Sequence, residues 1–469
     1  MQYSVVNYKT VKENSDFRID GEYYHPAILN RLNLLEGKNN ETLNNLVKFV
    51  VGPFGSTVTV DKYVDESAYR YIRNKDVNDF VISDDDPALI PENVYSPLKQ
   101  FHIQKNDLLL TVVGTLGKVA IAQEKDNKSI FSCKSTLLRS QKLNPYYLLT
   151  YLNSPTGQIF SLRGKRGAIQ EGLNLTDLKD IKVFIPSPDF QKFIEKLVKE
   201  SFNLLDGSKS LYSQAEQLLL SELELLNWKQ KHELAFVKNF SNAKEADRFD
   251  AEYFQPKYEE IIEAVKKYKG GFDTIGEQFT LSKKSFKKID DKEYRYIEIG
   301  CVNISDGTME AIILQGLELP ANAKIKLQRN DVIISKVRPY RGAIGIVDND
   351  DFVGSGAFTV LRENGIINKE TLMVFLRLKP LLDFSLKFNV GTSYPVITDE
   401  DILNFPLPKI VPEIQNQIKE KIIEMYTTKS LSKSLLEIAK RGVEMAIEKN
   451  EEEAGKWIDS EVRKLEIRI

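Results

Sequence analysis

Two stretches of the chain carry an apolar stripe at helical spacing. Leucines and other apolar residues recur three, four or seven positions apart, with one step of ten in the second stripe, a spacing typical of a coiled-coil seam. The first stripe consists of Ile194, Leu197, Leu204, Leu211, Ala215, Leu218 and Leu225, and the second of Ile414, Ile418, Met425, Leu435 and Ile438. Each begins after a proline and an acidic residue, Pro188-Asp189 and Pro412-Glu413, as helix starts prefer. We therefore predict two long helices that pack on each other along their stripes.

The residues before each long helix show a different pattern. Short β-branched runs end at turn residues, as at 49–51 before Gly52-Pro53 and at 108–113 before Gly114. This spacing predicts a curled, β-rich body with loops, not alternating βαβ units. A short helix is expected over 146–152, with Asn144 as its N-cap.

The chain repeats itself. Residues 18–26, Arg-Ile-Asp-Gly-Glu-Tyr-Tyr-His-Pro, return at 248–256 as Arg-Phe-Asp-Ala-Glu-Tyr-Phe-Gln-Pro. Other segments return in the same order, at separations of 222 to 225 residues: 69–72 at 294–297, 107–110 at 331–334, 136–139 at 359–362, and 175–177 at 397–399. Only small loop insertions separate the copies, so the chain consists of two copies of one unit.

The repeat predicts the order body, helix, body, helix. The expected segments are a first body at 1–187, a central helix at 188–231, a second body at 232–410, and a C-terminal helix with a charged tail at 411–469. Because the second body follows the end of the central helix, the last helix must run back antiparallel to cover the seam. The predicted fold is α+β: two homologous β-rich globular domains, joined by two long antiparallel coiled-coil helices and related by an approximate twofold axis.

Composition narrows the class of protein. A hydrophobic content of 42% and a charged content of 28% are typical of a globular chain. Charges interrupt the N-terminus before any apolar run of signal-peptide length, and no run could span a bilayer, which predicts a cytoplasmic protein without a membrane partner. Two cysteines at non-equivalent positions and three scattered histidines argue against a disulfide framework or a metal site.

A net charge of −2 argues against nucleic-acid binding through overall charge, but local basic clusters remain. Loops that contain glycine, proline or aromatic residues allow Arg, Lys, Ser and Thr to reach phosphates and base edges. The candidate DNA-binding residues are Ser56, Thr57, Arg163, Lys165, Arg166, Lys283, Lys284, Lys287, Lys288, Lys336, Arg338 and Arg341. The alternative for any single cluster is a solvated surface loop. Arg70 and Arg295 lie in repeated strand-like segments, where we expect a structural role.

Two segments are similar to enzyme motifs. Asn144-Pro-Tyr-Tyr147 is similar to the Asn-Pro-Pro-Tyr loop of adenine methyltransferases, and the segment 352–356 to their cofactor-binding glycine loop. Their counterparts in the other copy, Asn368-Lys369 and 131–133, keep neither pattern. We therefore predict a helix cap at Asn144 and no catalytic residue in the chain.

The duplicated arrangement resembles the specificity (S) subunit of type I restriction-modification systems. The resemblance covers essentially the whole chain and is carried by the paired segments 20–26 and 250–256, and by the paired Thr-Asp…Pro elements, each followed by a glutamine, Gln191 or Gln415. It implies two target recognition domains, each reading one half of an asymmetric bipartite sequence in double-stranded DNA. The helices would set the spacer and dock two modification (methyltransferase) subunits, and restriction subunits through them. It also implies that this chain binds no cofactor and that S-adenosylmethionine belongs to the modification subunits.

Three alternatives stay open at this stage. One is a stand-alone adenine DNA methyltransferase, and another is the DNA-reading subunit of a different multisubunit defence system. The third is a coiled-coil interaction scaffold without a DNA role.

Overall fold

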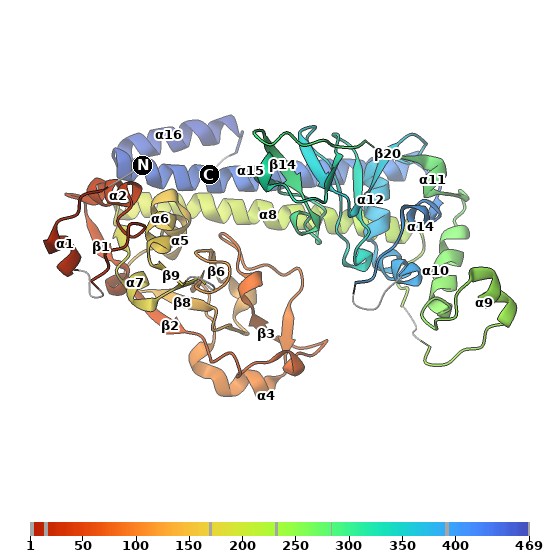
Figure 1. Ribbon diagram of the computed structural model, residues 1–469, viewed down its shortest axis with the longest axis horizontal. Helices are drawn as coiled ribbons and strands as arrows, with labels where there is room; N and C mark the ends of the chain where they lie inside the picture. The colour runs from red at the N-terminus through yellow and green to blue at the C-terminus, as the bar shows by residue number, and fades with distance from the viewer. Residues whose placement is uncertain are drawn as a thin grey trace. The chain divides into compact units, whose positions relative to one another are not determined.

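The computed structural model describes residues 4–13, 17–167, 171–229, 233–282, 284–389 and 394–467 (Figure 1). The chain forms two compact units: unit 1 comprises Met1–Leu204 and Ser430–Ile469, and unit 2 comprises Leu205–Lys429. The division falls inside both long helices, α8 (Pro188–Glu222) and α15 (Pro412–Glu448). Each unit thus contains part of each helix, so the compact units do not coincide with the four segments expected from the sequence.

The body of unit 1 contains two main sheets. The first has the antiparallel strand order β2 (Val47–Val51), β8 (Ser135–Ser140), β5 (Leu108–Thr111), β6 (Val119–Ile121). The second has the order β4 (Ala88–Ile90), β3 (Tyr69–Ile72), β7 (Ser129–Phe131), with β3 antiparallel to β4 and parallel to β7. Two small antiparallel pairs complete it: β1 (Asn40–Thr42) with β11 (Lys182–Phe184), and β9 (Lys165–Arg166) with β10 (Gly172–Leu173).

Short helices surround these sheets. Besides the long helices, unit 1 contains α1 (Tyr8–Glu13), α2 (Pro26–Leu35), α3 (Leu43–Leu46), α4 (Glu92–Tyr95), α5 (Pro145–Asn153), α6 (Pro155–Arg163), α7 (Leu175–Lys179) and α16 (Glu451–Lys464). The Asn144 side chain accepts hydrogen bonds from the backbone N–H groups of Tyr146 and Tyr147, which confirms the predicted N-cap. The charged tail expected at the C-terminus is the helix α16, whose Ala454, Ile458 and Val462 are buried.

Unit 2 repeats this order of elements. Its first sheet is β13 (Phe279–Leu281), β20 (Phe358–Glu363), β17 (Val332–Ser335), β18 (Ile344–Ile346), and its second is β15 (Ile312–Gln315), β14 (Glu293–Ile297), β19 (Phe352–Ser355), β16 (Ala323–Lys326). Strand β12 (Phe272–Thr274) pairs with β21 (Pro406–Pro408), and the short helices are α9 (Phe240–Ala246), α10 (Pro256–Lys266), α11 (Ile275–Gln278), α12 (Lys369–Arg377), α13 (Lys379–Phe384) and α14 (Asp399–Leu403). The predicted duplication is confirmed, and β16 is an added edge strand of the second copy.

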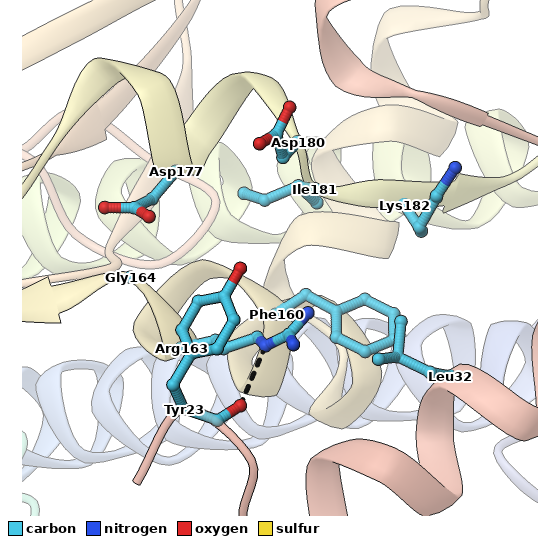
Figure 2. A pocket seen from close by; sticks show the side chains of 9 residues that line it. All are labelled: Tyr23, Leu32, Phe160, Arg163, Gly164, Asp177, Asp180, Ile181 and Lys182. Atoms are coloured by element: carbon cyan, nitrogen blue, oxygen red, sulfur yellow. Dashed lines mark hydrogen bonds between the residues drawn. The ribbon is translucent and has the colours of Figure 1, made fainter. Parts of the chain in front are cut away.

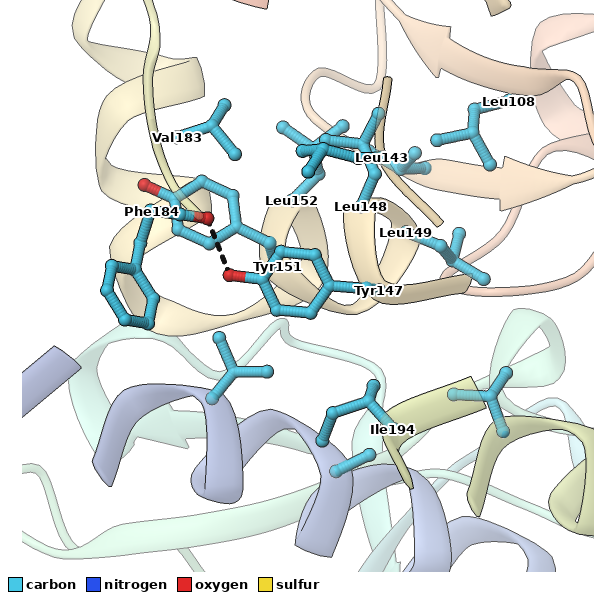
Figure 3. Packing of buried hydrophobic residues seen from close by; sticks show 14 of the residues in the cluster. Leu108, Leu143, Tyr147, Leu148, Leu149, Tyr151, Leu152, Val183, Phe184 and Ile194 are labelled. Carbon is cyan, nitrogen blue, oxygen red and sulfur yellow. Dashed lines mark hydrogen bonds between the residues drawn. The ribbon is translucent and has the colours of Figure 1, made fainter. Parts of the chain in front are cut away.

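The core of unit 1 lies between the body and the long helices. Tyr147 and Tyr151 of α5 are fully buried in the same cluster as Ile194 of α8 and Val443 of α15 (Figure 3). The Tyr147 hydroxyl donates to the backbone oxygen of Phe184 at 2.7 Å, so the ring is buried without losing its polar partner. Burial raises the pKa of Tyr147 well above its ordinary value. Each large side chain buried here contributes roughly 1.5–3 kcal/mol of transfer free energy.

The long helices run antiparallel, as predicted. In unit 1, Ile194 lies beside Gly442, and seven residues later Ser201 bonds to Ser432, so the residue number falls along α15 as it rises along α8. Each of these serine hydroxyls donates to the backbone oxygen of the other serine, at 2.9 and 2.8 Å. In unit 2, Lys421 Nζ donates to Gln214 Oε1 at 2.8 Å.

A repeated glutamine anchors the start of each long helix. Gln191 Oε1 accepts the Asn144 N–H at 3.0 Å, and Gln415 Oε1 accepts the Asn368 N–H at 2.8 Å. The repeated glutamines thus tie α8 to the N-cap of α5 and α15 to the N-cap of α12. None of the helices within the described residues combines the length and the apolarity that a membrane crossing requires.

A buried carboxylate joins α15 to the body of unit 1. Glu444 is 1% exposed and accepts hydrogen bonds from Thr156 N (2.7 Å), Thr156 Oγ1 (2.8 Å) and Arg31 (3.0 Å).

The two tryptophans of the chain can report separately on the unfolding of the two units. Trp457 packs on the core of unit 1, and Trp228 packs on the core of unit 2.

We expect Glu444→Ala to lower the stability of unit 1 by about 2–4 kcal/mol, because it leaves buried donors without an acceptor. Urea unfolding of the Trp228→Phe protein, followed by Trp457 fluorescence, measures this loss. The matched control is Glu437→Ala, which removes an exposed carboxylate from the same helix and should change stability by about 0.5 kcal/mol or less. Equal effects of the two substitutions would contradict the assignment of Glu444 as a buried anchor.

Candidate nucleic-acid interface

The repeated segments 18–26 and 248–256 form the same contacts in their own units. Arg18 pairs with Asp20 at 2.7 Å, and Asp20 Oδ1 accepts the Tyr23 N–H at 3.0 Å. In unit 2, Arg248 pairs with Asp250 at 2.7 Å, and Asp250 Oδ1 accepts the Tyr253 N–H at 3.0 Å. The guanidinium carbon lies 4.5 Å from the centre of the tyrosine ring in unit 1 and 4.9 Å in unit 2.

A second cation contacts each tyrosine. In unit 1, the Arg163 guanidinium lies 3.8 Å from the centre of the Tyr23 ring, and its Nε donates to the Tyr23 backbone oxygen at 2.9 Å (Figure 2). In unit 2, Lys387 Nζ lies 4.1 Å from the centre of the Tyr253 ring and donates to the Tyr253 backbone oxygen at 3.0 Å. We call these sets the cation–tyrosine clamps: Arg18, Asp20, Tyr23 and Arg163 in unit 1, and Arg248, Asp250, Tyr253 and Lys387 in unit 2.

The electrostatics of the clamps follow from partial burial. Burial favours the neutral acid of Asp20, but the bonds from Arg18 and from the Tyr23 N–H outweigh it, so the pKa of Asp20 is lowered. The pKa of Asp250 is lowered by the same balance of burial, Arg248 and the Tyr253 N–H. Burial lowers the pKa of Arg163 and of Lys387. The charged groups of the clamps therefore have partners within the chain, and their cation–π contacts and ion pairs hold the repeated segments 18–26 and 248–256 in place.

The hollow beside the clamp of unit 1 is too small for a nucleotide. It has a volume of about 20 Å³, comparable with the roughly 10–15 Å³ that one water requires. Tyr23, Arg163 and Asp177 are among its lining residues (Figure 2). Arg163, predicted as a DNA contact, is therefore placed in the internal clamp.

The other two predicted basic residues of this segment are ion-paired. Arg166 pairs with Asp177, the aspartate of the repeated Thr-Asp element, at 2.9 Å. Lys165 Nζ lies 2.6 Å from Glu171. Both side chains keep about a third or more of their surface exposed, so ion pairing positions them without hiding them.

Ser56 and Thr57 lie on a turn that follows β2. The Thr57 N–H donates to the Phe54 oxygen at 2.8 Å, and Lys62 Nζ donates to the Thr57 oxygen at 2.7 Å. Ser56 is exposed, and the neighbouring Phe54 is 86% exposed. Gly52 starts the turn, where a Cβ atom would lie 2.6 Å from the Ser132 backbone oxygen, so glycine is needed for the close approach.

The basic segment early in unit 2 lies along the edge strand β16. Lys283 lies outside the described residues, whereas Lys284, Lys287 and Lys288 are exposed. The Lys284 backbone oxygen accepts the Lys326 N–H at 3.1 Å, which aligns the segment with β16. Lys288 Nζ approaches the Gly316 oxygen at 3.3 Å and Asp290 at 3.6 Å.

Two of the predicted basic clusters meet in unit 2. Lys284 and Lys336 line one hollow of about 230 Å³, together with Lys324 of β16, and we call it the lysine hollow. The remaining described lining residues are Leu281, Ser282, Ser285, Ile325, Phe358, Thr359, Val360 and Asp399. Lys324 is not among the residues predicted from the sequence, although its alternation with Ile325 and Lys326 was a signal that it faces outward from a strand.

The third predicted basic cluster forms a tight turn. Arg338 has a left-handed backbone (φ 49°), and its guanidinium carbon lies 4.6 Å from the centre of the Tyr394 ring. Arg341 is exposed at the end of the 3-10 turn Pro339–Arg341. Neither residue is among those that line the lysine hollow.

The repeated arginines Arg70 and Arg295 differ. Arg70 of β3 pairs with Asp84 at 2.9 Å and also donates to the Ser83 oxygen, so it has the expected structural role. Arg295 of β14 is exposed, and within the described part of the chain no ion pair joins it. The same strand position thus presents a neutralised arginine in unit 1 and an outward-facing charge in unit 2.

The enzyme-like motifs have structural explanations. Asn144 caps α5, and 352–355 is strand β19, in which Gly354 pairs with Ile297 of β14. A glycine in the centre of a sheet cannot form a cofactor-binding loop.

Comparison with known proteins gives the class. Residues 51–217 match the family described as type I restriction modification DNA specificity domain. The chain is 29% identical over 137 residues to the type I restriction enzyme EcoBI specificity subunit of Escherichia coli, a match that covers 29% of each chain. It is 27% identical over 154 residues to the putative type I restriction enzyme MjaX specificity subunit of Methanocaldococcus jannaschii, covering 32% of this chain and 36% of that one. The matches span about a third of the length of these relatives.

Solved structures are similar over a longer span. The S subunit of a type I restriction-modification system from M. genitalium aligns with 88% of this chain and 96% of its own at 15% identity and a TM-score of 0.40. The HsdS subunit from Thermoanaerobacter tengcongensis aligns with 88% and 97% at 15% identity and a TM-score of 0.29. The match of residues 51–217 to the type I restriction modification DNA specificity domain, together with these relatives, confirms the predicted resemblance of the chain to specificity subunits.

We expect Arg163→Met to destabilise unit 1 by about 1–3 kcal/mol, because it removes both the ring contact and the hydrogen bond of the clamp. Arg163→Lys should retain most of this stability, because Lys387 makes both contacts in unit 2. Some loss is expected, since the ammonium group of lysine does not stack on a ring as the planar guanidinium of arginine does. Urea unfolding followed by Trp457 fluorescence checks both variants. Weaker DNA binding by Arg163→Met with unchanged unfolding would instead make Arg163 a DNA contact.

Proposed function

We propose that the chain is the DNA-recognition subunit of a type I restriction-modification complex and has no catalytic site of its own. One observation carries this proposal: unit 2 repeats the two main sheets and the clamp of unit 1, and most of the residues that match the DNA specificity domain, 51–217, lie in unit 1. A duplicated specificity domain provides two DNA-reading surfaces in one chain. The target is then a bipartite sequence in double-stranded DNA.

Each unit reads one half of this target, and the two halves differ in sequence. The repeated frame keeps its chemistry, as Arg163 and Lys387 illustrate, while the outward residues diverge. Arg70 is neutralised where Arg295 is exposed, and strand β16 occurs in the second copy. Divergence of this kind supports an asymmetric target, because direct readout depends on the donors and acceptors that each surface presents.

The long helices set the spacer between the half-sites and dock the partner subunits. Two equivalent frames offer equivalent positions to two identical modification subunits, and restriction subunits join through them. S-adenosylmethionine would be bound by the modification subunits, where the methylation takes place. Within this chain, the exposed Ser56, Lys284, Lys287, Lys288 and Arg341 are the favoured DNA contacts, and Thr57, Lys165, Arg166, Lys336 and Arg338 are further candidates.

We expect deletion of the gene to remove one split adenine-methylation motif from the host genome, since the partner methyltransferases would lose their sequence reader. Methylome sequencing of the host with and without the gene measures this, and re-expression of the chain should restore the motif.

The purified chain alone should transfer no methyl group from S-adenosylmethionine to DNA. Methyl transfer without partners would establish the stand-alone methyltransferase instead. A methylome that keeps every split motif after deletion would contradict the proposed role in modification.

A further inference from the structure

The lysine hollow of unit 2 has the composition of an anion site. Lys284, Lys324 and Lys336 face a single aspartate, Asp399, among its charged lining residues. Lys284 and Lys324 are exposed, and within the described residues neither is ion-paired. Ser282 also lines the hollow, and its hydroxyl oxygen is buried without a hydrogen-bond partner among the described residues. The hollow therefore offers two unneutralised ammonium groups to an anion.

One of the three lysines is held in place. Lys336 Nζ lies 3.2 Å from Asp399 Oδ1, and the same oxygen accepts the Thr359 hydroxyl at 2.6 Å. This arrangement fixes an ammonium group at the wall of the hollow while partly neutralising it. The volume of about 230 Å³ is more than ten times the roughly 10–15 Å³ that one water requires, which leaves room for a phosphate group.

We propose that the lysine hollow binds a phosphate group, and that in the assembled complex this group is a backbone phosphate of the DNA beside the half-site of unit 2. The DNA assignment rests on the proposed function, whereas the anion site itself rests on the residues that line the hollow. Lysine presents a compact positive charge to a phosphate, and such contacts fix the register of a protein on a duplex without reading its bases.

The described residues of unit 1 form no equivalent of this site. Val112 follows β5 where Lys336 follows β17, and the aspartate that corresponds to Asp399, Asp177, is paired with Arg166. The second sheet of unit 1 also has no described strand in the place of β16, which carries Lys324. The phosphate contact is therefore a property of one unit, and it makes the electrostatic contributions of the two units unequal.

The experiment compares the salt dependence of DNA binding for the wild type and for Lys284→Gln/Lys324→Gln, in the full chain assembled with its modification subunits. Loss of one phosphate contact should make the slope of log K against log salt shallower by about one. The matched control, Lys244→Gln/Lys267→Gln, removes two exposed lysines of unit 2 that do not line the hollow, and it should keep the wild-type slope. Trp228 fluorescence during unfolding verifies that both variants are folded.

The choice of duplex separates this inference from the proposed function. A backbone contact acts on any sequence, so the slope is measured on the target and on a shuffled duplex of equal length. Equal affinity of the wild type for both duplexes would refute the proposed sequence reading, and a shallower slope of the hollow variant would still support the phosphate site.

A second titration identifies the source of the phosphate. An unchanged slope of the hollow variant overturns the DNA assignment. If the wild type then binds inorganic phosphate and the hollow variant does not, the site takes a free anion. If neither binds inorganic phosphate, the anion site itself is refuted.

Discussion

Each unit depends on covering the apolar stripe of two antiparallel helices. Alone, either helix would expose residues such as Leu197 or Ile418, which are fully buried in the folded units. Burial comes from the partner helix and from the body, whose fully buried Tyr147 shares a cluster with both helices in unit 1. The helices are thus part of the core of each unit. This explains why the compact units divide the helices and do not end at them.

The cation–tyrosine clamp gives the repeat its physical meaning. A short motif recurs because a carboxylate, a tyrosine ring and two cations must meet, and the second cation comes from about 140 residues further along the chain, as the bond from Arg163 to Tyr23 shows. The second cation is Arg163 in unit 1 and Lys387 in unit 2, so the two units show that either residue type can make these contacts. Residues that hold the frame tolerate exchange within a chemical type. The position that follows the equivalent strands β5 and β17 changes type altogether, from the buried Val112 to the half-buried Lys336.

The structural features that could be predicted from the sequence are those that depend on a repeat or on a periodic pattern of residues. The stripes located both long helices, the order of the repeated segments predicted that they run antiparallel, and Asn144-Pro145 identified a capped helix. The basic clusters were less informative, because charge along the chain does not distinguish Arg163, whose guanidinium stacks inside the fold, from Lys284, which is exposed. The positions of charges along the chain also could not predict that Lys284, Lys324 and Lys336 line one hollow. These lysines come from separate segments, and the pairing of strands in the folded sheets brings the segments together. The burial of α16 was hidden for a related reason: its acidic start masks the stripe of Ala454, Ile458 and Val462.

The chain segments that make up each unit determine the order in which the two units can fold during synthesis. Unit 2 is one continuous segment, whereas unit 1 requires both Met1–Leu204 and Ser430–Ile469. At roughly 5–20 residues per second, the intervening segment takes about 10–45 s to leave the ribosome. During that interval the first part of α8 lacks the helix that covers it, and Thr156 lacks the Glu444 carboxylate. The second-encoded unit can thus be complete before the first, and the nascent first body is the species that a chaperone would need to shield.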